Sequence, residues 1–172
     1  MREFVAIDLA PGGAAGGRAP QHLTLRFLGE VDPAQNPELG RRLSEVAARS
    51  HPFSVRVEGI GAFPTPSRPR VVWVGVTDGR PELVALASAV RAAVADLFSG
   101  GDDEFVPHLT LFRVRSPSDR SIAAELLAGQ RPAPPSREVS VRELLLKRSI
   151  LGSGGAVHET LARFPLGIPP PA

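Results

Sequence analysis

The sequence predicts an α+β fold built from an internal duplication. The tetrapeptide His-Leu-Thr-Leu occurs twice, at residues 22–25 and 108–111, and similar elements surround both copies. The first half reads strand, linker, motif strand, helix and strand, and the second reads strand, helix, motif strand, helix and strand. The length of 172 residues suits one domain with a sizeable core. We therefore expect a single domain over residues 1–172.

The first half contains the patterns of three strands and one helix. Apolar residues recur on one helical face at Leu39, Leu43 and Val46, and Val55 and Val57 alternate with polar neighbours. Residues 10–21 form a Gly/Ala/Pro linker without apolar periodicity, and residues 61–69 read as irregular, turn-rich chain. The strands are expected at 3–9, 22–28 and 53–60, and the helix at 37–48.

The second half has a helix where the first half has only its linker. Pro81 in the first turn and the Gly100-Gly101 pair after the last apolar residue bound a helix over 81–98. A second helix over 119–128 takes Ser118 as its N-cap. The strands are expected at 70–77, 106–114, 139–150 and 157–164.

The amino-acid composition excludes several kinds of catalytic and metal-binding site. The chain has no cysteine, which excludes disulfides, thiolate metal sites and a cysteine nucleophile. Hydrophobic residues make up 42% and charged residues 22%, which are values of a globular protein. The first residues lack the apolar segment of a signal peptide and no apolar run reaches membrane-spanning length, so we expect a cytoplasmic protein. Lys147 is the single lysine among 20 basic residues.

The repeated tetrapeptide is the candidate site. In a strand, His and Thr share one face while the two leucines share the other. If a pseudo-twofold axis relates the halves, the two polar faces line one cleft. A lone His on a strand is most often structural. Two of only four histidines stand in the same tetrapeptide at matching places, however, and that favours a paired site.

Two imidazoles across a cleft suit a reaction that needs one base and one acid at neutral pH. We expect His22 and His108 to be these catalytic groups. The hydroxyls of Thr24 and Thr110 can donate hydrogen bonds to phosphoryl oxygens, where negative charge builds up. Neither motif has a second metal ligand beside it, so we expect no metal and no cofactor.

The residues five positions after each His are Phe27 and Arg113. Arg113 can neutralise phosphate charge and Phe27 can stack on a nucleobase. Strict alternation would turn both away from the His face, so each strand would need a bulge or strong twist. Counted by the same alternation, Arg26 falls on the His22 face and is a competing phosphate or RNA contact.

The whole chain resembles the bacterial and archaeal RNA 2',3'-cyclic phosphodiesterases, first described as 2'-5' RNA ligases, of the 2H phosphoesterase superfamily. The paired His-x-Thr motifs are typical of the superfamily, and the Phe-Pro and Arg-Pro-Arg segments of this branch. The matching segments are residues 4–7, 22–30, 61–64, 68–73, 107–111 and 161–166.

The resemblance implies a bilobal fold of two antiparallel sheets with flanking helices that face across a central cleft. It also implies hydrolysis of an RNA 2',3'-cyclic phosphate to a 2'-phosphomonoester, with 2'-5' ligation as a related reaction. His108 would activate water and His22 would protonate the leaving 3'-oxygen, or the reverse. Arg113 and Phe27 carry over as phosphate and base contacts. The expected partners are RNA with cyclic phosphate ends or small cyclic nucleotides, and the expected state is a monomer away from membranes.

Three departures from the family pattern stand out. The linker 10–21 replaces the usual first helix, Phe112 stands where a small residue is common and could crowd the cleft, and His158 replaces the usual Tyr. We read His158 and His51 as structural or exposed.

The alternatives to this function are an RNA- or nucleotide-binding module with little or no turnover, and a 2H phosphodiesterase of other specificity. A metallohydrolase is disfavoured because no ligands cluster in the sequence.

Overall fold

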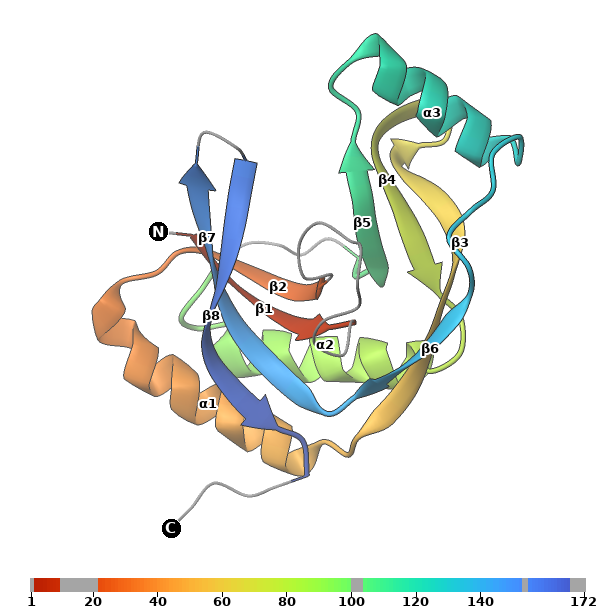
Figure 1. Cartoon of the computed structure of the whole chain (residues 1–172). Coiled ribbons are helices and arrows are strands. Elements are labelled where there is room, and N and C mark those ends of the chain that lie inside the picture. The colour runs from red at the N-terminus through yellow and green to blue at the C-terminus, as the bar shows by residue number, and fades with distance from the viewer. Residues whose placement is uncertain (1, 10–21, 100–103, 153–154, 168–172) are drawn as a thin grey trace.

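The computed structural model describes residues 2–9, 22–99, 104–152 and 155–167, which form two antiparallel sheets and three α-helices (Figure 1). The α+β class and the two-sheet layout predicted from the sequence are therefore confirmed. The elements are β1 (Arg2–Asp8), β2 (His22–Glu30), a short 3-10 helix (Pro33–Gln35), α1 (Asn36–Arg49), β3 (Phe53–Thr65), β4 (Arg68–Val76), α2 (Arg80–Val94), β5 (His108–Arg113), α3 (Pro117–Leu127), β6 (Arg137–Val141), β7 (Glu143–Gly152) and β8 (Gly155–Pro165).

The first sheet has the strand order β2-β1-β7-β8 and the second sheet has the order β5-β4-β3-β6. By position, β2 corresponds to β5, β1 to β4 and β7 to β3, so both motif strands are edge strands next to an equivalent partner. The first sheet takes two strands from the start of the chain and two from its end. The sheets therefore do not coincide with the sequence halves, although the duplication is visible in their order.

One core joins both sheets to α1 and α2. Apolar residues of β1, β2 and β7 meet those of β3, β4 and β6, and Leu39, Leu43 and Ala47 of α1 fill the same cluster. The spacing of four residues places these three side chains on one helical face. Burial of a leucine side chain contributes about 1.5–3 kcal/mol. In Figure 1, α1 and α2 lie on one side of the molecule, and the β7–β8 hairpin and β5 with α3 extend on the other.

The stretch 61–69 is regular structure, not the irregular segment expected from its glycines and prolines. β3 continues to Thr65 and pairs with β4, with Gly61 opposite Trp73. An added Cβ at Gly61 would collide with the Trp73 indole, so the glycine makes room for that ring. The Phe63 ring packs 5.1 Å from the Trp73 ring, centroid to centroid, and this aromatic pair holds the hairpin together.

The strand expected over 139–150 is two strands in two different sheets. β6 ends at Val141, opposite Phe53 of the second sheet, and β7 begins at Glu143, opposite Pro165 of the first sheet. A continuous apolar run does not show where a chain changes hydrogen-bonding partners. The prediction of one strand was therefore wrong.

Two helix bounds also differ from those expected. α3 begins at Pro117, because the Ser116 hydroxyl accepts from the Asp119 amide and the Asp119 carboxylate accepts from the Ser116 amide, which makes Ser116 the N-cap instead of Ser118. α2 ends at Val94, four residues before the expected end. The linker 10–21, expected in place of a first helix, lies outside the described residues.

Candidate active site

Both His-x-Thr motifs lie at the exposed edges of their sheets, and the two edge strands touch. β2 is the outer strand of the first sheet, β5 is the outer strand of the second, and residues of β2 contact residues of β5. Leu23, Leu25 and Leu109 are buried in the core, whereas His22 and His108 are half-buried. The alternation predicted from the sequence therefore places the leucines inward and leaves the imidazoles on the other face.

Each motif strand carries a β-bulge at the leucine that follows its threonine. In the first sheet Thr24 lies opposite Ala6 and Arg26 lies opposite Val5, so Leu25 is the extra residue. In the second sheet Thr110 lies opposite Trp73 and Phe112 lies opposite Val72, so Leu111 is the extra residue. The same irregularity at the same motif position supports the duplication and reverses the alternation beyond it.

The bulges bring Phe27 and Arg113 to the face of the histidines. Phe27 lies opposite Phe4, and the centroids of these two rings are 6.0 Å apart. The Phe4 ring centroid is also 5.1 Å from that of His22. Arg113 lies opposite Val71, two positions from Trp73 on the His108 face. Phe27 is 70% exposed and Arg113 is also exposed, so both side chains are open to a ligand. The bulge that the sequence argument required is confirmed.

The same bulges overturn two expectations about neighbouring residues. Arg26 is on the core side of β2, is only 8% exposed and donates from Nη2 to the Phe98 carbonyl oxygen at 3.2 Å. It is therefore not on the His22 face, and the expected phosphate or RNA contact was wrong. Phe112 likewise points away from His108 and packs with Val72 against α3, so it does not crowd the site.

His108 is held in one orientation by the segment just before β5 and by two aromatic rings. Its Nδ1 atom lies 2.7 Å from the Val106 carbonyl oxygen. A carbonyl only accepts hydrogen bonds, so Nδ1 carries a proton, and in the neutral ring Nε2 keeps its lone pair. The Phe63 ring meets the imidazole edge-to-face at 4.8 Å and the Trp73 ring lies 6.1 Å away. This arrangement prepares Nε2 to accept a proton.

His22 lies in an aromatic cluster of the first sheet. Its ring is 5.1 Å from the Phe4 ring and 4.7 Å from the His158 ring, which it meets edge-to-face. Asp8 is the register partner of His22 on β1. Burial and then the charge of Lys147 lower the pKa of His158 below its ordinary value. His158, which the sequence argument read as structural or exposed, thus contacts the candidate acid or base directly.

Lys147 is the residue near the site that sequence reasoning missed. It is 2% exposed, and its Nζ atom donates to Asp8 Oδ1 at 3.0 Å and to Thr160 Oγ1 at 3.1 Å. It lies opposite Phe4 in the ladder of β1 and β7, on the face that carries His22. A buried ammonium needs such partners because its loss of hydration is costly. One feature of the sequence could have identified this residue: it is the chain's single lysine, and it directly follows three leucines.

The two threonines complete the set that the structure brings to neighbouring edge strands. Thr24 is half-buried on β2, and Thr110 is exposed on β5. All six predicted site residues therefore lie on two contacting strands, on the histidine face of each. Across the described ranges, no group of three His, Cys, Asp or Glu residues could hold a metal ion. No helix among the described elements is long and apolar enough to cross a membrane.

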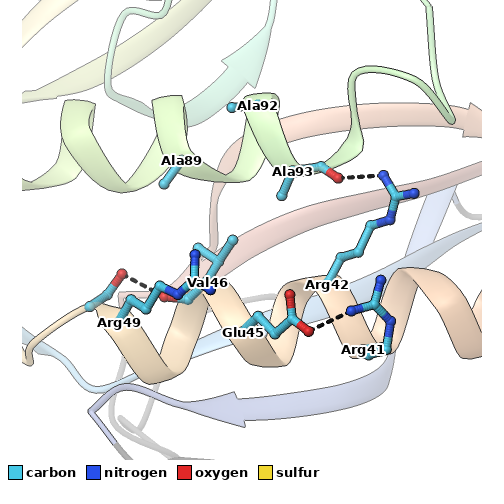
Figure 2. Close-up of a pocket in the computed structure, with 9 residues that line it drawn as sticks. Arg41, Arg42, Glu45, Val46, Arg49, Ala89, Ala92 and Ala93 are labelled. Carbon is cyan, nitrogen blue, oxygen red and sulfur yellow. Dashed lines mark hydrogen bonds and ion pairs between the residues drawn. The ribbon is translucent and has the colours of Figure 1, made fainter.

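A hollow of about 540 Å³ lies elsewhere, between α1 and α2 (Figure 2). Alanines of α2 and arginines of α1 line it, and two of these arginines are engaged. Arg41 pairs with Glu38 and Glu45, and Arg42 pairs with Glu38 and Asp96 and donates to the Ala93 carbonyl oxygen. No described histidine lines the hollow, and the Ser50 hydroxyl there donates to the Val46 carbonyl oxygen, so we do not assign the chemistry to it.

The family model of the 2'-5' RNA ligase superfamily matches residues 2–149. A relative from Aquifex aeolicus named RNA 2',3'-cyclic phosphodiesterase is 36% identical over 148 residues, which cover 85% of this chain and 78% of that protein. A relative of the same name from Archaeoglobus fulgidus is 35% identical over an alignment of 183 positions, which spans 95% of this chain and 99% of that protein.

Solved structures show the same fold. A protein of Thermus thermophilus matches with a TM-score of 0.74 and 28% identity, over 97% of this chain and 98% of that one. E. coli LigT complexed with 3'-AMP matches with a TM-score of 0.73 and 27% identity, over 96% of this chain and 97% of that one. The layout of two sheets with three described helices is therefore shared with these proteins.

Proposed function

The chain belongs to the 2'-5' RNA ligase superfamily, and from this premise we propose that it hydrolyses RNA 2',3'-cyclic phosphate ends to 2'-phosphomonoesters. The observation that carries the proposal is the pair of His-x-Thr motifs on contacting edge strands, each followed by a bulge at the same position. The names of the relatives from Aquifex aeolicus and Archaeoglobus fulgidus support the same substrate class. The substrate is RNA with such an end, or a small cyclic nucleotide.

The reaction needs one proton acceptor and one proton donor. His108 accepts a proton from water through Nε2, because its Nδ1–H is already committed to the Val106 carbonyl oxygen. The water oxygen bonds to phosphorus while the bond from phosphorus to the 3'-oxygen breaks. His22, as imidazolium, gives its proton to the departing 3'-oxygen. The products are a 2'-phosphomonoester and a free 3'-hydroxyl, and exchange with solvent restores both rings.

The remaining site residues stabilise charge and hold the substrate. The hydroxyls of Thr24 and Thr110 donate to the non-bridging oxygens, where negative charge grows as water attacks. The guanidinium of Arg113 forms charge-assisted hydrogen bonds to the same phosphate. The exposed ring of Phe27 stacks on the nucleobase. No step requires a metal or a cofactor.

A 5'-hydroxyl of a second RNA in place of water would give ligation by the same steps. Its oxygen bonds to phosphorus, the 3'-oxygen leaves with the proton of His22, and the product is a 2'-5' phosphodiester. We also propose that the protein acts as a cytoplasmic monomer, which cell fractionation and light scattering would test.

The test is incubation with an RNA that ends in a 2',3'-cyclic phosphate, followed by identification of the terminal phosphate. We expect a 2'-phosphate, unchanged turnover in the presence of a chelator, and a bell-shaped pH profile, because one ring must start with a proton and the other without one. A 3'-phosphate product or inhibition by the chelator would overturn the mechanism. Binding of the RNA without turnover would favour the alternative of a binding module.

A further inference from the structure

The two outer strands of the first sheet reach each other through a cluster of three rings. Phe4 belongs to the inner strand β1, His22 to one edge strand and His158 to the other. The His158 ring lies 4.7 Å from that of His22 at an interplanar angle of 79°, and 5.3 Å from that of Phe4 at 86°. The His22 ring is therefore packed on one side by Phe4 and on another by His158.

From this contact we propose that His158 is a positioning residue, whose ring holds the His22 imidazole in the orientation for proton transfer to the 3'-oxygen. The inference rests on the proposed function, because His22 must be one of its two proton-transfer groups. His158 itself touches neither the phosphate nor the reacting atoms. It acts only through the ring of His22.

Burial and the neighbouring Lys147 both favour the neutral form of the His158 ring. Lys147 of β7 faces it from the neighbouring strand, and partial burial and this cation together lower the pKa of His158. Asp8 of β1 and Thr160 of β8 hold the Lys147 ammonium in place. A charged His158 would stand beside a charged His22, and two like charges at this separation disfavour each other.

Arg2 shares the face of Phe4 and His158, opposite Ser149 in the ladder, whereas one ion pair of these strands lies on the opposite face. Glu3 and Arg148, the sequence neighbours of Phe4 and Lys147, form an ion pair of 3.1 Å there. The Nδ1 atom of His158 is buried and has no hydrogen-bond partner within the part of the chain that the structure describes. Packing against the rings of His22 and Phe4 is thus what orients His158. Another aromatic ring of similar shape at position 158 should therefore orient the His22 imidazole in the same way.

The experiment compares His158→Ala with His158→Phe in the full chain. If ring packing is the function, His158→Ala lowers kcat for a 2',3'-cyclic nucleotide by about 10- to 100-fold with little change in KM, which is the size expected from a misplaced catalytic group. His158→Phe, which keeps a ring without a titrating group, restores most of kcat. His51→Ala, at an exposed histidine of the loop between α1 and β3, is the matched control. Unchanged kcat in His158→Ala, or an equal loss in His158→Phe, would overturn the proposal.

A second readout does not depend on turnover. Proton NMR measures nuclear Overhauser contacts between the His22 and Phe4 rings, which report the orientation of His22. We expect these contacts in the wild-type protein and in His158→Phe, and their loss in His158→Ala. Their persistence in His158→Ala would reject the positioning role. Absence of turnover in a wild-type protein that has these contacts would reject the proposed function instead.

Discussion

The Nδ1 atom of His108 donates a hydrogen bond of 2.7 Å to the carbonyl oxygen of Val106, two residues before it on the same chain segment. Because the Nδ1 proton is held in this bond, Nε2 is the atom of His108 that can exchange a proton with the substrate or with water. The fixed tautomer makes His108 the better candidate for the base that activates water. His22 then supplies the proton, in an environment built from Phe4, His158 and the Lys147–Asp8 pair.

Replacement of either catalytic histidine should abolish most turnover without unfolding the protein. We expect His22→Ala and His108→Ala each to lower kcat/KM for a 2',3'-cyclic nucleotide by about 10²–10⁴-fold, the usual contribution of a general acid or base. Both side chains are only half-buried and lie outside the apolar core, so circular dichroism and the melting temperature should change little. Turnover close to that of the wild type would remove the residue from the mechanism.

The two arginines near the bulges should separate into a structural and a functional residue. Arg26→Ala removes a buried hydrogen bond to the Phe98 carbonyl oxygen and should cost about 1–3 kcal/mol of unfolding free energy. Arg113→Ala removes an exposed cation beside the phosphate and should leave stability unchanged while it lowers kcat/KM by about 10²-fold. Urea denaturation and steady-state kinetics on both variants measure this. The reverse pattern would mean that the assignment of faces is wrong.

Removing one partner of the Lys147–Asp8 pair should lower the free energy of unfolding more than removing both partners. Lys147→Met leaves the Asp8 carboxylate without its cation, and we expect a loss of about 1–3 kcal/mol, below the full cost of a buried pair because Asp8 is 26% exposed. The double variant Asp8→Asn/Lys147→Met should recover part of that loss. Chemical denaturation of the two single variants and the double variant gives the coupling free energy. A coupling near zero would show that the two charges do not interact.

Stability should decrease as the pH falls through the histidine range, partly because of His158. Its pKa is lowered in the folded protein by burial and by Lys147, so the unfolded chain binds the proton more readily. The unfolded state is then favoured increasingly as pH falls from about 7.5 to about 5. His158→Phe should have a shallower slope of unfolding free energy against pH over this range. An identical slope would show that His158 does not contribute.

The carboxylates should not obscure that measurement. Hydrogen bonds from Arg41 and Arg42 hold the pKa of Glu38 at about 2, below its ordinary value of 4.5. The stability that this lowered pKa reflects is present above the ordinary value and is lost only as the pH falls through the folded value. The Glu38 side chain is also 40% exposed, so its ion pairs contribute little. The range above about 5 therefore reports mainly on histidines.

The repeated tetrapeptide was enough to predict both motif strands and the inward leucines, and the need for a bulge followed from placing Phe27 and Arg113 in the site. Arg26 was misplaced because the alternation was counted through Leu25 as if the strand were regular. Had the bulge been applied to Arg26 as well as to Phe27, the sequence would have placed Arg26 in the core. A bulge at Leu25 moves every later residue of the strand, Arg26 included, to the other face.

Contacts between distant segments could not be predicted from the sequence. His158 meets His22 because β7 pairs with β1 and β8 extends the same sheet, and no local pattern encodes that pairing. The same long-range pairing places Lys147 beside Asp8. The prolines of residues 61–69 suggested a loop, whereas packing of Phe63 on Trp73 makes the segment a hairpin. Tertiary contacts decided each of these cases.

The central claim is that His22 and His108 reach one phosphate together. The most direct test is an NMR titration of the protein with 2'-AMP, which carries the phosphomonoester of the proposed product, while the imidazole resonances of both histidines are followed. The account predicts that both sets of resonances shift with the same dissociation constant, and that those of His51 do not move. A shift of only one of the two catalytic rings, or two different dissociation constants, would contradict it.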